Sequence, residues 1–186
     1  SYVLENNLEN LVLAGTEAIN GTGNSLNNNL LGNSQDNILI GERGDDILEG
    51  GGGADTLDGG AGNDIYIFDR GDGADLVMDF QKKSNTDILS LGSDISAEQI
   101  WFSHSGNDLV MNIIGTQDSI TVKDWYSGSA NHIEQFTLAN GEVLLDTQVQ
   151  ALVDAMASFA PPAAGQTTLP QNYQDVLAPV IAANWQ

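Results

Sequence analysis

Residues 41–67 consist of three nine-residue blocks in tandem: GERGDDILE at 41–49, GGGGADTLD at 50–58 and GGAGNDIYI at 59–67. All three fit the pattern GGxGxDxUx, in which U is a large apolar residue. The register is kept throughout, with aspartates at Asp46, Asp55 and Asp64 and apolar residues at Leu48, Leu57 and Tyr66. A single GxGxxD motif is compatible with a flexible loop, whereas three copies in one register predict a repeated structural unit. No GK[ST] motif and no long helical pattern follow the glycines, which argues against a nucleotide-binding loop.

Each block divides into a short strand and a turn. In the xUx part the apolar side chain points inward, because successive side chains of a strand lie on opposite faces. The glycine-rich part can adopt positive φ angles and curl its carbonyls toward one point. Calcium takes roughly six to eight oxygen ligands from carboxylates and carbonyls. One turn cannot supply that many oxygens, but two stacked turns can.

The blocks resemble the calcium-binding nonapeptide repeats of the RTX (repeats-in-toxin) family of secreted bacterial proteins. The resemblance implies an all-β fold, a parallel β-roll in which two nonapeptides form one coil and several Ca²⁺ ions bind between turns. Asp46 and Asp64 would face one ion at one edge, and Asp55 would lie at the opposite edge. The implied neighbours of Asp55 are the turn near Asp36 and Asn37 and the turn that ends at Asp75. The remaining implied ligands are the carboxylate of Asp79 and the carbonyls of Gly44, Gly51, Gly53, Gly60 and Gly62.

The repeat extends upstream in a degenerate form. Counting back by nine from Leu48 gives Leu39 and Leu30, in blocks that keep the first glycine. Both blocks carry asparagine at the aspartate position, Asn28 and Asn37. Asparagine is neutral but tolerates left-handed turns, so we expect metal-poor coils that lengthen the roll, with Asp36 and Asn37 as the one pair that could complete a site. The predicted roll spans 1–80, with degenerate repeats at 15–40 and calcium-binding repeats at 41–67.

The charge of the chain is strongly negative. It has 26 acidic and 5 basic residues, a net charge of −21, and no cysteine. Twelve acidic residues lie between Gly32 and Asp79, against Arg43 and Arg70. Without a cation these carboxylates repel, and a segment so poor in bulky apolar residues is expected to be disordered. The acidity argues against nucleic acid and anionic membranes as partners, and no apolar run is long enough to predict a membrane span.

Residues 81–147 read as short strands separated by Gly, Asn, Asp and Ser. The order GNDLV, DSITVKDW and IEQF resembles the haemolysin-type calcium-binding-related module found beside RTX repeats, which implies a β cap that continues the sheets of the roll. Asn140-Gly141 predicts a type I′ hairpin turn. We expect a packed core that includes Trp101, Phe102, Trp125, Tyr126 and Phe136, the alternative being an aromatic strip that binds a sugar or a peptide. His104 and His132 lack a metal-ligand or nucleophile motif and are expected to be surface or packing residues.

Residues 148–186 contain no Lys or Arg and all four prolines. Val149, Leu152, Val153 and Met156 have the spacing of an amphipathic helix. A second pattern begins at Tyr173, and Pro179 is expected to interrupt it. By position and composition this tail resembles the C-terminal signal of type I secretion substrates. Two alternatives stay open: a helix that docks on the β cap, which is compatible with a signal, and a linker to a missing domain.

Together these features predict a secreted or cell-surface calcium-binding module that folds on Ca²⁺ outside the cell and whose tail is recognised by a type I exporter. The first residue is Ser1 rather than Met, which indicates a piece of a larger protein. The module is expected to be monomeric and not itself an enzyme. Two alternatives stay open: an adhesin whose cap binds a surface glycan or a protein through Trp101 or Trp125, and the non-catalytic C-terminal part of a secreted RTX hydrolase.

Overall fold

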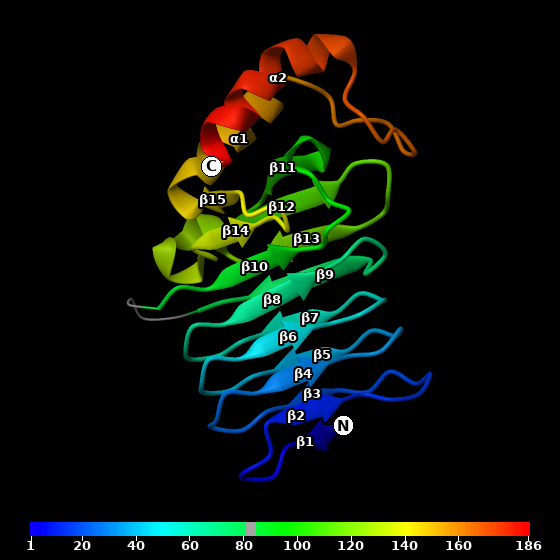
Figure 1. Cartoon of the computed structure of the whole chain (residues 1–186), viewed down its shortest axis with the longest axis vertical. Coiled ribbons are helices and arrows are strands. Elements are labelled where there is room, and N and C mark those ends of the chain that lie inside the picture. Colours follow the sequence, from blue (N-terminus) through cyan, green and yellow to red (C-terminus); the bar gives the residue numbers. More distant parts are fainter. Residues whose placement is uncertain (81–84) are drawn as a thin grey trace.

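The structure is a computed structural model that describes residues 1–80 and 85–186. The chain winds into a long stack of β-strands, with the N-terminus at one end and two helices at the other (Figure 1). The predicted all-β class, with a parallel β-roll, a β cap and short C-terminal helices, is confirmed.

The roll is built from two parallel sheets that receive alternate strands. One sheet contains β1 (Tyr2–Val3), β3 (Gly21–Thr22), β5 (Ile38–Ile40), β7 (Thr56–Asp58) and β9 (Ala74–Met78). The other contains β2 (Asn10–Val12), β4 (Asn29–Leu31), β6 (Ile47–Glu49) and β8 (Ile65–Phe68). The degenerate blocks therefore form strands in the same stack as the complete repeats.

Each strand from β4 to β9 places the apolar side chain of its U position on the axis of the roll. The U positions are stacked in register, Leu30 beside Leu48 and Tyr66 in one sheet, Leu39 beside Leu57 and Val77 in the other. All of them are at most 1% exposed. Since side chains alternate along a strand, the residues on either side of each U position face outward. The core of the roll is consequently one side chain wide on each sheet.

The cap continues both sheets before it closes them. Strands β10 (Ile88–Leu91) and β14 (Gln135–Thr137) extend one sheet in parallel, and β13 (Ser119–Val122) extends the other. Three antiparallel strands complete the cap: β11 (Ile100–Ser105), β12 (Asp108–Ile113) and β15 (Val143–Leu145). Short 3₁₀ turns lie at Ala97–Gln99, Trp125–Ser127 and Ser129–Asn131.

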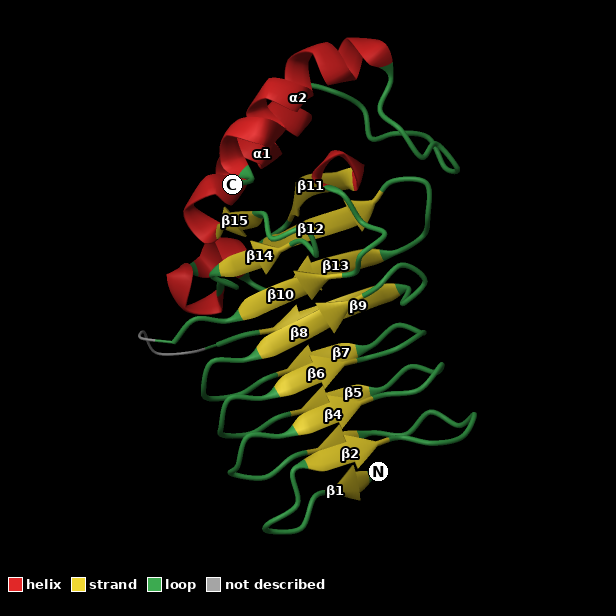
Figure 2. Cartoon of the chain, viewed as in Figure 1, coloured by secondary structure: helices red, strands yellow, loops and turns green. Residues whose placement is uncertain are grey.

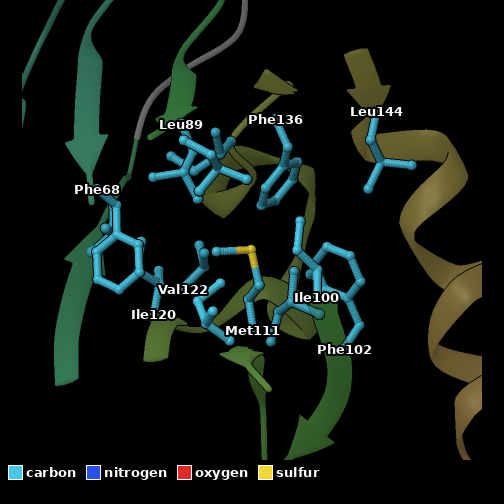
Figure 3. Close-up of a cluster of buried hydrophobic side chains, with 14 of the residues drawn as sticks. Phe68, Leu89, Ile100, Phe102, Met111, Ile120, Val122, Phe136 and Leu144 are labelled. Carbon is cyan, nitrogen blue, oxygen red and sulfur yellow. The ribbon is translucent and has the colours of Figure 1, made fainter. Parts of the chain in front are cut away.

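Where the roll meets the cap, buried side chains from several strands share one core, among them Phe68, Leu89 and Met111 (Figure 3). Phe102 and Phe136 make an edge-to-face contact with ring centroids 5.8 Å apart. Trp101 and Trp125 are 3% and 4% exposed, so the predicted aromatic core is confirmed for these four rings. Tyr126 is only partly buried and lies beside the exposed His104. His132 is a packing residue, because its ring stacks on Trp125 and its Nδ1 lies 3.1 Å from Asp146 Oδ2.

The type I′ turn predicted at Asn140-Gly141 is wrong. Such a turn needs positive φ at both central residues, and of this pair only Gly141 has one, at 94°. The strands are joined instead by a three-residue loop, in which Gly141 N donates to Leu138 O and Leu138 N donates to Glu142 O. Asn140 accepts a hydrogen bond from Glu142 N with its own side chain, which favours this looser loop.

The tail folds onto the cap as two helices, α1 (Asp146–Met156) and α2 (Gln171–Asn184), shown in red in Figure 2. The predicted apolar face of α1 is confirmed, since Val149, Leu152, Val153 and Met156 are all buried. The predicted interruption at Pro179 is wrong, because α2 runs through it. Pro179 cannot donate a hydrogen bond, but Leu177 and Ile181 on either side are buried and hold the helix in place. Among the described residues, neither helix has the length and apolar character that would cross a bilayer.

Candidate calcium sites

The turns that join the two sheets form two rows, one along each edge of the roll. The first edge carries the turns 23–28, 41–46 and 59–64 and then residues 79–80 and 85–87, and it includes Asp46, Asp64 and Asp79. The second edge carries the turns 13–20, 32–37, 50–55 and 69–73, and it includes Asp36, Asn37 and Asp55, with Asp75 just beyond it in β9. The structure thus places Asp46 with Asp64 and puts Asp55 on the opposite side.

Each row is held by a ladder of hydrogen bonds from a backbone N–H to a carboxylate of the next coil. On the first edge Asn28 N donates to Asp46 Oδ1 at 2.6 Å, and Asp46 N donates to Asp64 Oδ1 at 2.8 Å. On the second edge Asn37 N donates to Asp55 Oδ1 at 2.7 Å, and Asp55 N donates to Asp75 Oδ1 at 2.9 Å. One oxygen of each carboxylate is therefore used to fix the spacing of the coils.

The other carboxylate oxygen is the feature that points to a metal. Asp46 Oδ2 and Asp55 Oδ2 are buried and have no hydrogen-bond partner among the described residues. Such an oxygen is costly to bury unless a cation or a donor compensates it. Burial raises the pKa of Asp46 and of Asp55 to about 6, and of Asp64 and Asp75 to about 7, although backbone N–H donors act in the opposite direction. These aspartates fit Ca²⁺, which is bound by carboxylate and carbonyl oxygens.

Backbone geometry explains why glycine occupies the remaining positions. The five predicted carbonyl donors all have positive φ, between 81° and 152°: Gly44, Gly51, Gly53, Gly60 and Gly62. At the first position of a block, glycine is also required for a steric reason. A Cβ on Gly41 would collide with the carboxylate of Asp46, and a Cβ on Gly59 would collide with that of Asp64. Glu42 is an exception, because it has a φ of 82° where the other two complete blocks have glycine.

In the coils that carry asparagine, side-chain amides rather than a cation compensate the carbonyl oxygens of the turns. Asn37 Nδ2 donates to Ile19 O at 2.8 Å, and Asn33 Nδ2 donates to Glu17 O at 2.9 Å, both in the preceding turn of the second edge. On the first edge Asn24 Nδ2 donates to Leu8 O at 2.7 Å. The amide groups thus bond to turn carbonyls that would otherwise be free for a cation.

Asp36 and Asn37 are not brought together as a ligand pair. The oxygen of the Asn37 side chain accepts a hydrogen bond from Asn33 N at 2.7 Å. Asp36 is exposed, and its Oδ1 accepts a hydrogen bond from Ala54 N at 2.9 Å, outside the row of buried aspartates. Both residues therefore serve the stacking of coils in this structure.

Asp87 is a candidate site residue that was not predicted from the sequence. Asp64 N donates to Asp87 Oδ1 at 2.7 Å, so Asp87 is the next member of the first-edge ladder. It stands 23 residues after Asp64 rather than 18, which removes it from the nonapeptide register. The local sequence Asp87-Ile88-Leu89 repeats Asp46-Ile47-Leu48, and that signal could have identified it.

Stacked coils, buried aspartates and carbonyl-rich turns at both edges define a calcium-binding parallel β-roll. Comparison with known families agrees: residues 22–57, 31–66 and 43–77 match the RTX calcium-binding nonapeptide repeat, and residues 108–148 match the haemolysin-type calcium binding protein related domain. The chain is an RTX haemolysin-type calcium-binding protein, and its repeats bind Ca²⁺.

Proposed function

We propose that Ca²⁺ ions bind between consecutive turns of the roll and that their binding drives its folding. The first-edge ligands are Asp46 and Asp64, and the second-edge ligands are Asp55 and Asp75, completed by carbonyls of Gly44, Gly51, Gly53, Gly60 and Gly62. The observation that carries this proposal is the pair of buried, unpartnered oxygens, Asp46 Oδ2 and Asp55 Oδ2.

The same chemistry makes the roll a folding switch for export. A core one side chain wide offers little hydrophobic stabilisation, and the buried carboxylates oppose folding until a cation compensates them. Extracellular calcium modules bind with Kd of about 10⁻⁴–10⁻³ M, so the repeats stay unfolded in a cytosol low in Ca²⁺ and fold outside. On this proposal the chain is the calcium-folded C-terminal module of a larger secreted bacterial protein, whose own activity lies in other residues.

The tail at 148–186 has two successive roles in this scheme. Before folding it is the export signal that a type I exporter recognises, and after folding it covers the end of the cap. The second role is supported by the buried Leu177, Ile181 and Trp185 and by the hydrogen bonds between Gln186 and Val143. A glycan or protein partner bound through Trp101 or Trp125 is not favoured, because both rings lie in the core.

Far-UV circular dichroism of the chelated protein tests the switch. Addition of Ca²⁺ should produce a cooperative gain of β signal, and Mg²⁺ should not replace it, because Mg²⁺ requires a small, nearly octahedral site and gives up water reluctantly. A fully folded spectrum in excess chelator would refute the switch.

Deletion of residues 148–186 tests the tail. The truncated chain should keep Ca²⁺ binding at the repeats, lose export through a type I exporter and melt at a lower temperature because the cap is uncovered. Normal export of the truncated chain would rule out the signal role. The point variant Trp185→Ala serves as a control, since it weakens docking while it keeps nearly all of the tail.

A further inference from the structure

Three carboxylates converge on the first edge where the roll meets the cap. Asp79 follows β9, Asp87 precedes β10 and Glu134 precedes β14, and each offers an oxygen that lies within 4.8 Å of the others. Asp79 is 4% exposed and Asp87 is 1% exposed, while Glu134 is half-buried. Glu134 is 47 residues from Asp87 in the sequence, and Asp79 and Asp87 lie outside both family matches.

Asp79 occupies a position that the repeats reserve for glycine. Asp58 pairs with Met78, so Asp79 stands one coil above Gly59. A Cβ on Gly59 would collide with the aspartate of its own turn, Asp64. In the last turn Asp79 instead makes a side-chain hydrogen bond with the aspartate of its own turn, Asp87. The space that glycine leaves in the repeats is thus filled here by a second carboxyl group.

The Asp79 side chain has an uncompensated oxygen inside this cluster. Asp79 Oδ1 is buried and finds no hydrogen-bond partner in the described part of the chain. The ion pairs that the described residues form involve other carboxylates, those of Asp94, Asp108 and Asp146. Burial, the hydrogen bond with Asp87 and the neighbouring carboxylates raise the pKa of Asp79 well above its usual range. A cluster of this kind is stable only with a proton or a cation at its centre.

We propose that Asp79, Asp87 and Glu134 bind one further Ca²⁺ ion, and that this ion fastens the cap to the roll. The ladder of the first edge leads directly to this position, because Asp64 N donates to Asp87 and Asp87 N donates to Glu134 Oε2 at 2.8 Å. Carboxylate oxygens are the ligands that the hard Ca²⁺ ion prefers. The inference goes beyond the folding switch of the repeats, since two of the three ligands, Asp87 and Glu134, belong to the cap.

The ion count per chain tests the junction site directly. The double variant Asp79→Asn/Glu134→Gln of the whole chain is compared with wild type by equilibrium dialysis at saturating Ca²⁺. We expect the variant to bind one ion fewer. The matched control is Asp154→Asn/Glu98→Gln, which removes two exposed carboxylates from α1 and the cap and should leave the count unchanged. Equal counts for the double variant and wild type would overturn the proposal.

Melting curves show whether a lower ion count results only from a failure of the variant to fold. Neutralising carboxylates that repel each other should leave the β signal of the chelated chain unchanged or higher. The same variant should melt several degrees lower than wild type in Ca²⁺. If a shared proton rather than an ion held the cluster, the amide introduced by Asp79→Asn would still donate to Asp87. The variant would then melt no lower than wild type in Ca²⁺, which overturns the proposal. A wild-type chain that binds no Ca²⁺ at all would contradict the proposed function instead.

Discussion

The coils at 23–40 and those at 41–67 share one backbone but compensate their turn oxygens differently. In the first region asparagine amides donate to the carbonyls of the preceding turn, as Asn37 does to Ile19 O. In the second region aspartates take the same place and leave buried oxygens, Asp46 Oδ2 and Asp55 Oδ2, without a donor. One change of side chain, from amide to carboxylate, thus replaces an internal donor by a requirement for an external cation.

This difference also divides the roll by function. An asparagine coil has no buried carboxylate at the ladder position, so on the proposed folding switch it lengthens the roll without adding dependence on Ca²⁺. On the same proposal an aspartate coil is unstable until the ion binds. The calcium-sensitive part of the roll would then lie next to the cap and the insensitive part at the N-terminal end.

Acidification should produce the largest effect, because it acts on several aspartate turns at once. The pKa values of Asp46, Asp55, Asp64 and Asp75 are raised to about 6–7, so without Ca²⁺ the folded chain binds more protons than the unfolded chain between about pH 4 and pH 7. The free energy of unfolding therefore falls as pH rises through this window, by roughly 1–3 kcal/mol for each group once solvent screening is allowed for.

Circular dichroism in chelator at pH 5 and pH 8 measures this dependence. We expect more β signal at pH 5 than at pH 8. In Ca²⁺ the order should reverse, since protons compete with the ion for the same oxygens. A calcium-free chain that gains structure as pH rises would show that these aspartates are not the groups that oppose folding.

Removal of one aspartate should have the next largest effect. Asp64→Ala deletes a carboxylate that the first-edge turns share, and ligand charge sets the affinity of calcium sites. The Ca²⁺ concentration at the midpoint of folding should rise by about tenfold or more, equivalent to roughly 1.4 kcal/mol. His104→Ala, on an exposed residue of the cap, is the control. Identical calcium titrations of the two variants would contradict the assignment of Asp64.

Conversion of an asparagine coil to an aspartate coil should make its stability depend on Ca²⁺, as in the coils at 41–67. Asn37→Asp loses the donor to Ile19 O and sets a carboxylate against that carbonyl. At low Ca²⁺ we expect the free energy of unfolding to fall by about 1–3 kcal/mol, the cost of a buried group left unsatisfied. Ca²⁺ should restore part of the lost stability. The free energy of unfolding, measured with urea, should therefore differ more between low and high Ca²⁺ for the variant than for wild type. A loss of the same size in both conditions would mean that the new carboxylate recruits no ion.

The sequence predicted the site residues that recur at a fixed period and missed Asp87 and Glu134, which do not. Asp46, Asp55 and Asp64 recur every nine residues, and the resemblance to RTX repeats, which implies two nonapeptides per coil, assigned them to their edges. Asp87 and Glu134 continue the same ladder, but the chain between their turns has grown and no period connects them. Tertiary packing also overrode a local rule in the tail, where buried neighbours keep α2 helical through Pro179.

The role of the asparagines was predicted only in part. Neutral side chains at Asn28 and Asn37 indicated metal-poor coils, and the structure adds the reason, because their amides bond to carbonyls one coil away. A donor eighteen residues from its acceptor leaves no local signal in the sequence.

The smallest effect concerns Glu42, which holds a φ of 82° where the second and third blocks have glycine. A residue with a Cβ is strained in this region by roughly 1–2 kcal/mol, and glycine is not, although glycine costs more backbone entropy on folding. Glu42→Gly should therefore stabilise the calcium-bound chain by about 1 kcal/mol, which raises the melting temperature by roughly 2–4 °C in a protein of this size. Glu17→Gly is the matched control, because Glu17 is also an exposed acidic turn residue but does not have positive φ, and glycine there should lower the melting temperature or leave it unchanged. Equal shifts for the two variants would show that charge, rather than backbone strain, sets the stability of the turn at Glu42.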